Sequence, residues 1–401
     1  MKTGFYARTK ILVLAAAVWS STLLPALSTT PSQAATQPAQ TTKVADGTAT
    51  KKSGSKTRRK RLAKRRYYER FTTSSYATDT IEGDIIGGEN PIVRQAAIEA
   101  LGNMNGSLLA IDPTSGRILT MVNQKLALSE GSQPCSTIKL AVALAALNEK
   151  IITRDTKVML SPRPSSAMDL TDALAHSNNA FFERLGKELG FEKVSYYAHE
   201  FGLGELAGYN IEGEHLGVFP SEELDSKLGG VGKMCSFGES ISMTPLQLGA
   251  LVSAIANGGT LFYLQHPISS EDVLSFQPKI KRQLDIAPLI PDLELGMSGA
   301  VEYGTARSLR LSFNEEQILG KTGTCSKDGT RFGWFASYAN TQAGHIVAVV
   351  FLRGGRPTFG PRAAAISGKF YRALYDQKFF TAPATAANQP VVGRPAAGAS
   401  Q

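Results

Sequence analysis

Three short motifs in this sequence have the residue types and spacing needed for acyl-transfer chemistry. Ser136 is followed by Lys139 three residues later, Ser177 is followed by Asn179 two residues later, and Lys321 begins a Lys-Thr-Gly sequence. A serine hydroxyl becomes a strong nucleophile when a nearby base takes its proton, and an unprotonated lysine can be that base. The three motifs together predict a serine acyltransferase.

The order of the motifs carries the prediction, because each motif alone is common. Ser53 and Lys56 also have the Ser-x-x-Lys spacing, but they lie in a polar, basic stretch without apolar periodicity. About one or two such chance matches are expected in a chain of this length. Ser136 instead stands at the start of an apolar helical stretch, where a helix can hold it in place.

The expected chemistry assigns a role to each polar side chain. Ser136, at a helix N-terminus, is the nucleophile, and Lys139 lies one turn later on the same face. Lys139 must be neutral to accept a proton, and burial together with a second cation, Lys321, would lower its pKa. Ser177 can relay a proton to the leaving amine. Asn179 can hold Lys139 and bind a substrate amide.

The sequence from Lys321 to Thr324 reads as an edge strand along which an extended peptide can lie antiparallel. Gly323 allows a close approach of backbones. The backbone N–H groups of Ser136 and Thr324 would form an oxyanion hole, and each such donor contributes about 3 kcal/mol in analogous sites. Lys321 and a threonine hydroxyl would bind a terminal carboxylate, and Thr322, Gly323 and Thr324 are the predicted substrate-binding residues. The predicted substrate is a peptide attacked at its last amide.

The elements that must position these residues come from both ends of the folded region. Two strands at 106–112 and 117–122 flank the turn sequence Asp-Pro-Thr-Ser-Gly and predict a hairpin. Three more strands are predicted at 317–324, 333–338 and 345–352. The last of these is continuously apolar, which is typical of a central strand buried on both faces.

The segments between these strands have helical patterns. A helix starting at Ser136 is apolar almost all round through Leu147 and should be buried. Further helices are predicted at 170–189 and 192–201, after a capping box at Thr244, and at 361–375. The predicted fold class is α/β (α+β): an antiparallel sheet flanked by helices, with an inserted all-α subdomain.

The charge of the chain is concentrated near its N-terminus. The 401 residues have a net charge of +9, but residues 41–70 contain 12 Lys and Arg against 2 Asp and Glu. Residues 1–34 have the order of an export signal, either cleaved or kept as a membrane anchor. Residues 35–75 read as a basic, polar linker whose residues 51–66 could contact anionic lipid or envelope polymers; nucleic acid is not an expected partner.

Residues 76–380 are predicted to form the catalytic domain, and residues 381–401 a disordered tail rich in Ala, Pro and Gly. No metal or cofactor is expected, because the five histidines lack ligand spacing and one Gly-rich segment at 202–208 follows a helix rather than a strand. An exported protein would work in the periplasm or at the outer face of the cytoplasmic membrane.

Beyond the three motifs, the chain resembles the transpeptidase domain of penicillin-binding proteins, which belongs to the β-lactamase/transpeptidase-like superfamily. Four further segments carry this resemblance: 109–116, 201–214, 242–259 and 304–306. The resemblance covers roughly residues 95–378. It implies that peptidoglycan stem peptides acylate Ser136 through their penultimate D-alanine, that the last D-alanine leaves, and that the acyl group passes to an amine. It also implies covalent binding of β-lactam antibiotics.

Two cysteines depart from the family's usual residues, because Cys135 and Cys325 flank the nucleophile and the Lys-Thr-Gly motif. If the motifs converge, these cysteines lie close together and can pair or stay reactive, with Cys235 as the competing partner. The sequence leaves this pairing open.

Three alternative functions remain open at this level. A D,D-carboxypeptidase uses the same residues with water as the acceptor. A serine β-lactamase needs a deacylating base, and the sequence offers no convincing glutamate loop for one, while Asn178 stands where one lactamase class has Asp. The non-enzyme alternative is a penicillin-sensing or scaffolding module that is acylated without turnover.

Overall fold

The computed structural model describes residues 70–162, 166–341 and 344–380. The predicted signal segment 1–34, the basic cluster 51–66 and the tail 381–401 lie outside the described residues. At the start of the described chain, Thr72 donates its N–H to the carbonyl of Gly329 at 2.9 Å, so ordered contacts with the folded body begin before residue 76. Within the described ranges, every helix is too short or too polar to cross a bilayer.

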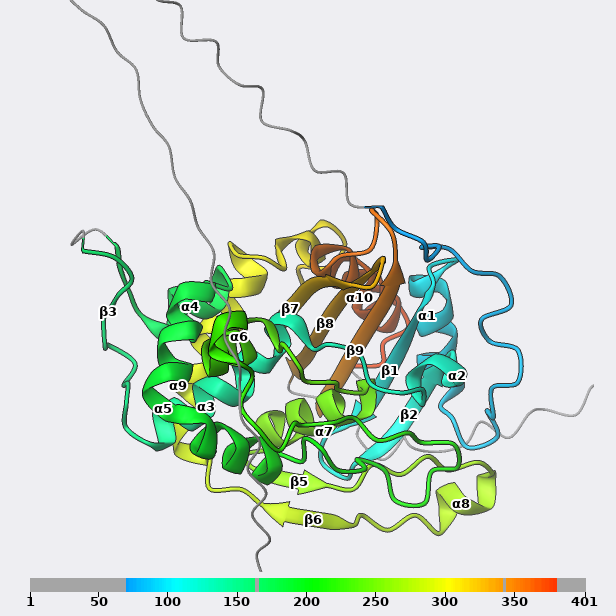
Figure 1. Cartoon of the computed structure of the whole chain (residues 1–401). Helices are drawn as coiled ribbons and strands as arrows, with labels where there is room; N and C mark the ends of the chain where they lie inside the picture. Colours follow the sequence, from blue (N-terminus) through cyan, green and yellow to red (C-terminus); the bar gives the residue numbers. More distant parts are fainter. Residues whose placement is uncertain (1–69, 163–165, 342–343, 381–401) are drawn as a thin grey trace, which may run out of the picture. The chain divides into compact units, whose positions relative to one another are not determined.

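The centre of the fold is a five-stranded sheet in the order β2-β1-β9-β8-β7, with every pair antiparallel (Figure 1). Its strands come from the two ends of the described chain, as the sequence predicts. Their bounds are β1 Gly106–Asp112, β2 Arg117–Val122, β7 Ile318–Lys327, β8 Thr330–Thr341 and β9 Gly344–Gly354. The apolar strand β9 is central and β7 forms one edge, which confirms both predictions.

Side chains alternate between the two faces of the sheet and divide the core in two. Leu109 and Val349 belong to the core on one face, whereas Leu108 and Val350 belong to the core on the other. This alternation follows from the two-residue repeat of a strand. Because both faces are buried, β1 and β9 read as almost uninterrupted apolar runs.

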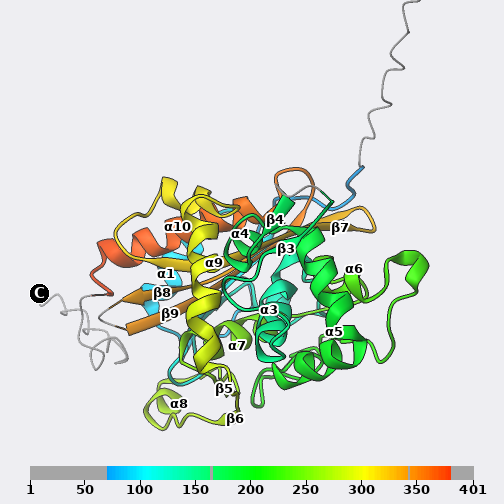
Figure 2. The same cartoon turned by 90° about the vertical axis from the view of Figure 1, so that its left-hand side faces the viewer.

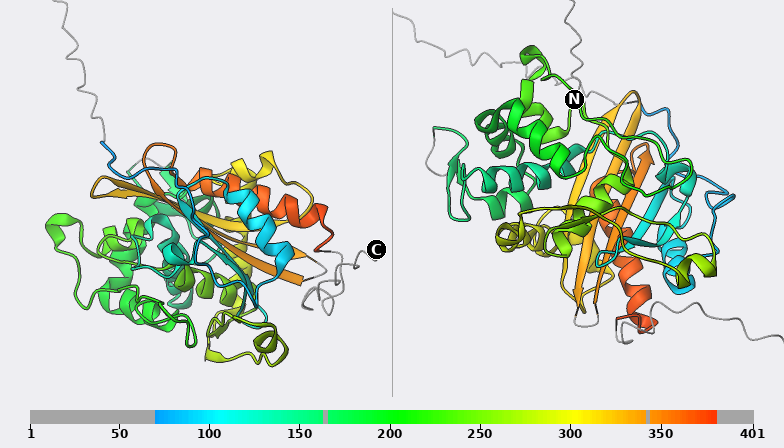
Figure 3. Two further views of the ribbon diagram at one scale, coloured as in Figure 1. Left: turned by 90° about the vertical axis from the view of Figure 1, so that its right-hand side faces the viewer. Right: turned by 90° about the horizontal axis from the view of Figure 1, so that it is seen from below.

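Helices cover both faces, as expected for this fold class. On one face α1 (Pro91–Leu101) packs beside α10 (Gly360–Asp376), and Figure 3 shows the two together. On the other face α7 (Pro245–Ala256) lies against β9. The predicted capping box starts α7: the hydroxyl of Thr244 accepts the N–H of Gln247, whose side chain accepts the N–H of Thr244.

The helical part that carries the nucleophile lies on the α7 side of the sheet (Figure 2). Its helix α3 (Lys139–Asn148) is buried on nearly all sides, as predicted, and packs against α5 (Asn179–Glu200). The other helices have these bounds: α2 Gln124–Ala127, α4 Leu170–Ala175, α6 Gly230–Phe237, α8 Ser270–Leu274 and α9 Ile290–Glu302. Short 3₁₀ turns have these bounds: η1 Cys135–Ile138, η3 Ser226–Leu228, η4 Ala287–Leu289 and η5 Arg307–Leu311.

Two details differ from the sequence prediction. The predicted helix at 170–189 is broken between α4 and α5, because Ser177 has a left-handed backbone (φ 55°) and Asn178 caps the next helix by accepting the N–H of Phe181 at 3.0 Å. The segment between the sheet halves is also not wholly helical. It contains two small sheets, formed by these strands: β3 Val158–Met159 with β4 Ala167–Met168, and β5 Thr260–Phe262 with β6 Ile280–Gln283.

Candidate active site

Ser136 lies in the 3₁₀ turn η1, immediately before α3. A hydrogen bond within the turn stabilises it: the hydroxyl of Thr137 donates to the carbonyl of Pro134 at 2.7 Å. Cys135 and Thr137 are buried, whereas Ser136 is partly exposed. The sequence predicts an α-helix from Ser136 itself; the structure has a tighter turn there and α-helix from Lys139. Ser136 therefore lies in this 3₁₀ turn, three residues before Lys139 at the start of α3.

The side chain of Lys139 is fully buried and points at the Ser177 loop. Its Nζ donates to Oδ1 of Asn179 at 2.6 Å, to the carbonyl of Ser177 at 2.8 Å and to Oγ of Ser177 at 3.2 Å. The ring of Phe182 lies beside the same amine, at 5.3 Å from its centroid. The helix break at Ser177 is what turns these oxygens toward Lys139.

Lys321 reaches the same loop from strand β7. Its Nζ donates to Oγ of Ser177 at 2.8 Å and to the carbonyl of Thr322 at 3.0 Å. The Ser177 hydroxyl therefore contacts both lysine amines. Four of the predicted residues, 139, 177, 179 and 321, meet in one hydrogen-bonded cluster although they come from separate parts of the chain.

Burial changes the protonation of both lysines. Burial first, and then the charge of Lys321, lowers the pKa of Lys139 to about 6, while the carboxylate of Glu183 opposes this shift. Burial lowers the pKa of Lys321 to about 7. With a pKa of about 6, Lys139 is largely neutral at pH 7 and can accept a proton, whereas Lys321, with a pKa of about 7, is still partly protonated there. The predicted role of Lys139 as a base requires this neutral state, whereas the opposing effect of Glu183 is not evident from the sequence.

The edge strand β7 lies directly against the nucleophile turn. Its residues alternate, so Lys321, Gly323 and Cys325 face the Ser136 side. A Cβ added at Gly323 would lie 2.9 Å from the carbonyl oxygen of Pro134, a distance that real Cβ atoms hardly ever show. Glycine is therefore required here by the close approach of the two backbones.

A disulfide joins the nucleophile turn to this strand. It links Cys135 to Cys325, with their Cα atoms 5.5 Å apart and a sequence separation of 190. Each cysteine is the direct neighbour of a residue whose backbone N–H is predicted to form the oxyanion hole, Ser136 and Thr324. The third cysteine, Cys235, is free and buried, and burial raises the pKa of its thiol to about 12. The structure thus decides the pairing that the sequence leaves open.

The two threonines of the strand have partners on its other face. The hydroxyl of Thr322 donates to the hydroxyl of Thr305 at 2.7 Å, and the hydroxyl of Thr324 accepts the N–H of Gly360 at 2.8 Å. Thr305 lies in the Gly-Thr-Ala sequence at 304–306, a segment that carries the family resemblance but whose residues have no role predicted from the sequence.

Among the described residues, no group of His, Cys, Asp or Glu side chains is arranged to hold a metal ion.

This arrangement agrees with comparisons to known proteins. Residues 106–376 match the family model of the penicillin binding protein transpeptidase domain. The chain is 28% identical over 260 residues to stage V sporulation protein D of Bacillus subtilis, a match that spans 57% of this chain and 39% of that protein. It is 24% identical over 384 residues to the peptidoglycan D,D-transpeptidase PbpA of Mycolicibacterium smegmatis, spanning 78% of this chain and 75% of that protein.

Solved structures show the same fold. The chain is similar to the D,D-transpeptidase domain of a peptidoglycan glycosyltransferase from Eggerthella lenta, with a TM-score of 0.60 and 19% identity over 72% of this chain and 82% of that one. It is also similar to penicillin-binding protein A of M. tuberculosis in an imipenem acyl-enzyme complex, with a TM-score of 0.59 and 21% identity over 71% of this chain and 78% of that one. The predicted β-lactamase/transpeptidase-like fold is confirmed.

Proposed function

This chain belongs to the penicillin-binding protein transpeptidase family, and from that membership we propose that it is a peptidoglycan D,D-transpeptidase with Ser136 as its nucleophile. The observation that carries the proposal is the contact of both lysine amines with the Ser177 hydroxyl, with the partly exposed Ser136 three residues before Lys139 in the sequence. A hydroxyl between two amines can pass a proton from one part of the site to another.

The first half-reaction forms an acyl-enzyme. Neutral Lys139 takes the proton of Ser136, whose Oγ attacks the carbonyl carbon of the penultimate D-alanine. The backbone N–H groups of Ser136 and Thr324 stabilise the oxyanion that develops. The C–N bond to the last D-alanine then breaks, and its amine receives a proton through Ser177. Lys321 and Thr322 bind the terminal carboxylate of the substrate, and Asn179 holds Lys139 and binds the substrate amide.

The second half-reaction transfers the acyl group to an amine. The amine attacks the ester carbonyl and a new C–N bond forms. The ester C–O bond to Oγ of Ser136 then breaks, and the proton lost by the attacking amine returns through Lys139 to that oxygen. Water in place of the amine would give a D,D-carboxypeptidase from the same residues. The named relatives favour the transpeptidase, since two of the proteins or domains that match are called D,D-transpeptidases. β-Lactams would acylate Ser136 in the same way and remain bound.

A peptidoglycan substrate supports a location outside the cytoplasm. Peptidoglycan stem peptides and β-lactams are its proposed partners, and export to the periplasm or the outer face of the cytoplasmic membrane fits the predicted signal at 1–34. Attraction of residues 51–66 to an anionic envelope surface stays a prediction, because these residues lie outside the described ones.

Two assays on the purified protein test the proposal. Labelled penicillin should stay bound to the wild type and be absent from Ser136→Ala. A peptide ending in D-Ala-D-Ala should release D-alanine and, with an added amine, yield the cross-linked product. Rapid hydrolysis of the penicillin would identify a β-lactamase instead, and retained label without D-alanine release would identify a sensor or scaffold. Undiminished labelling of Ser136→Ala would contradict the proposal outright.

A further inference from the structure

The helix that binds Lys139 also carries a carboxylate, Glu183, to which the proposed mechanism gives no role. Oδ1 of Asn179, the first residue of α5, accepts a hydrogen bond from Nζ of Lys139 at 2.6 Å. The ring of Phe182 lies beside the same amine. Glu183 follows Asn179 by four residues, so the two side chains are neighbours on one face of α5. The face of α5 that contacts Lys139 therefore presents both an amide and a carboxylate.

The carboxylate of Glu183 also contacts helix α6. Its Oε1 accepts a long hydrogen bond, at 3.5 Å, from the hydroxyl of Ser236, which is fully buried. Helix α6 packs against both α5 and the nucleophile turn η1, and Figure 2 shows α3, α5 and α6 side by side. At the end of α6, a Cβ added at Gly238 would lie 2.5 Å from Cγ of Pro134. Glu183 is thus part of the helix packing that supports the nucleophile turn.

Two charged side chains act on the amine of Lys139, in opposite directions. Burial and then Lys321 of β7 lower the pKa of Lys139, whereas Glu183 raises it. Other charged side chains of α5, α6 and α9 have different surroundings: Arg184 bonds Glu188, Lys233 lies over the ring of Phe237, Glu294 accepts the hydroxyl of Tyr338, and Lys187 and Glu192 are exposed. Glu183 itself forms no salt bridge within the described part of the chain, so no surface cation neutralises it.

The mechanism requires two opposing properties of Lys139. Its amine must be neutral before the reaction, and it must be basic enough to take the proton of Ser136. Burial and the charge of Lys321 favour the neutral amine but weaken it as a base, because both disfavour the ammonium form. A nearby carboxylate has the opposite effect, since it stabilises the ammonium that forms when the proton is transferred. Glu183 supplies such a carboxylate.

We propose that Glu183 is a positioning residue of the acylation centre, whose carboxylate, in contact with Ser236, stabilises the ammonium form of Lys139 while Ser136 is deprotonated. The proposal rests on the proposed function, because it refines the proton-transfer step of the same centre. The proton passes from Oγ of Ser136 to Nζ of Lys139, and Glu183 gains and loses no proton. Glu183 acts only through Lys139 and does not contact the substrate.

The test is the pH profile of the second-order rate constant of penicillin acylation in wild type and Glu183→Gln. In wild type the acid midpoint should lie at the pKa of Lys139, about 6. Loss of the opposite charge should lower this midpoint by about one pH unit, and the weaker base should lower the plateau rate about threefold. The variant should therefore be about twofold faster than wild type at pH 5 and about threefold slower at pH 7. General damage to the site would make it slower at both.

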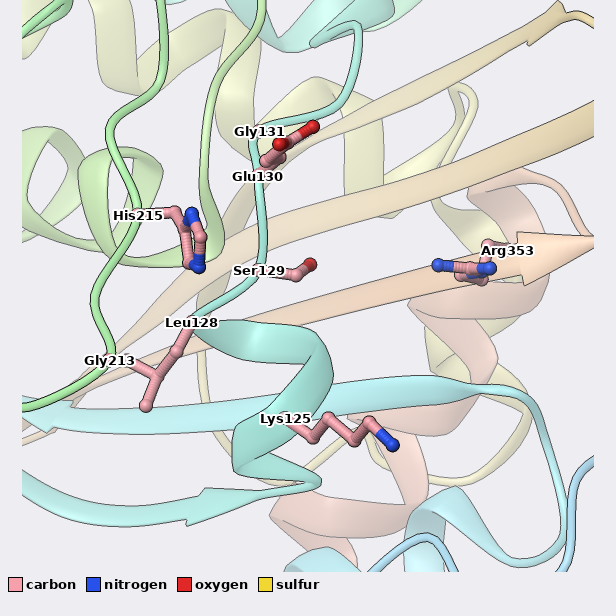
Figure 4. A pocket seen from close by; sticks show the side chains of 8 residues that line it. All are labelled: Lys125, Leu128, Ser129, Glu130, Gly131, Gly213, His215 and Arg353. Carbon is pink, nitrogen blue, oxygen red and sulfur yellow. The ribbon is translucent and has the colours of Figure 1, made fainter.

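Matched variants separate this effect from a general loss of charge. Glu188→Gln removes an exposed carboxylate from the same helix, and Glu130→Gln removes one from the loop that leads to the nucleophile turn. Figure 4 shows Glu130 at an open pocket whose lining includes none of the proposed catalytic residues. Both variants should keep the wild-type midpoint.

Two further substitutions at position 183 complete the test. Glu183→Asp keeps the charge and should bring the midpoint back toward the wild-type value. Glu183→Ala removes the charge with a smaller side chain and should shift the midpoint as Glu183→Gln does. It provides the same measurement if Glu183→Gln does not fold, and circular dichroism checks the folding of each variant.

Three outcomes would overturn the role of Glu183. These are an acid midpoint in Glu183→Gln that equals or exceeds that of wild type, a rate lowered by the same factor at pH 5 and pH 7, and an equal shift of the midpoint in either control variant. Failure of the proposed function looks different, because wild type would then show no penicillin label at any pH, or label without release of D-alanine from a D-Ala-D-Ala peptide.

Discussion

Two sets of cations in this protein have opposite properties. Lys139 and Lys321 are fully buried, and their pKa values fall to about 6 and about 7. Lys125 of α2 and Arg353 of β9 are exposed on the surface. Burial, more than residue type, therefore decides whether the pKa of a lysine falls far enough for it to accept a proton at neutral pH.

The largest expected effect comes from removing the buried amine. Lys139→Met should lower the rate of penicillin acylation about 10³-fold, because the serine loses its proton acceptor. Stopped-flow or gel-based labelling measures this rate, and circular dichroism checks that the variant is folded. The same substitution at exposed Lys369 should change the rate less than twofold. Comparable losses of acylation rate in both variants would show that the effect does not depend on the burial of Lys139.

Removal of the disulfide tests whether the stability of the fold and the acylation of Ser136 depend on this covalent link. The double variant Cys135→Ala/Cys325→Ala should lose about 4 kcal/mol in the free energy of unfolding, since the link closes a 190-residue separation. Acylation should also slow, because Ser136 and Thr324 are the neighbours of the two cysteines. Urea unfolding measures the first effect and penicillin labelling the second. Cys235→Ala is the control, and an equal loss of acylation in it would contradict this role.

The pH dependence follows from the two lowered pKa values. Acylation should rise about tenfold per pH unit below pH 6 as Lys139 loses its proton, and fall above pH 7 as Lys321 loses the charge that binds a carboxylate. For stability, a lysine whose pKa is lower in the folded state binds fewer protons when folded. The free energy of unfolding should therefore rise with pH from about 6 toward the ordinary lysine pKa of 10.5.

The measurements for this prediction are rate profiles of wild type and Lys139→Met, with unfolding curves at matching pH. In the variant, the acylation rate should no longer rise with pH below pH 6. The increase in the free energy of unfolding that is due to Lys139 should also be absent. A wild-type acylation rate that stays flat between pH 4.5 and 7 would show that Lys139 is not the proton acceptor.

The smallest expected effect concerns the partner of the Lys-Thr-Gly strand. Thr305→Val removes the hydroxyl that Thr322 contacts at 2.7 Å, at a cost of about 1 kcal/mol. Binding of substrates with a terminal carboxylate should weaken about fivefold, seen as a higher KM with little change in kcat. Thr305→Ser should restore the wild-type value. A change in kcat alone would place Thr305 in the proton-transfer machinery instead.

Much of the fold follows from local sequence patterns. The hairpin of β1 and β2 was predictable because Asp-Pro-Thr-Ser-Gly favours a turn between two apolar runs. The start of α7 was predictable because Thr244 and Gln247 satisfy each other's backbone groups locally. The break at Ser177 was missed, although the Asn178 cap gave a signal for it. The apolar residues on both sides of the break continue a helical pattern and hide the boundary.

The sequence by itself determined which chemical groups the protein has, in what order, and which segments become strands and helices, because these depend on residue types and near neighbours. The contact of Ser177 with two lysines and the pairing of Cys135 with Cys325 became visible only in the tertiary structure. Each of these depends on burial and on distances between segments far apart in the chain. Such distances are fixed when the sheet assembles, and no local pattern encodes them.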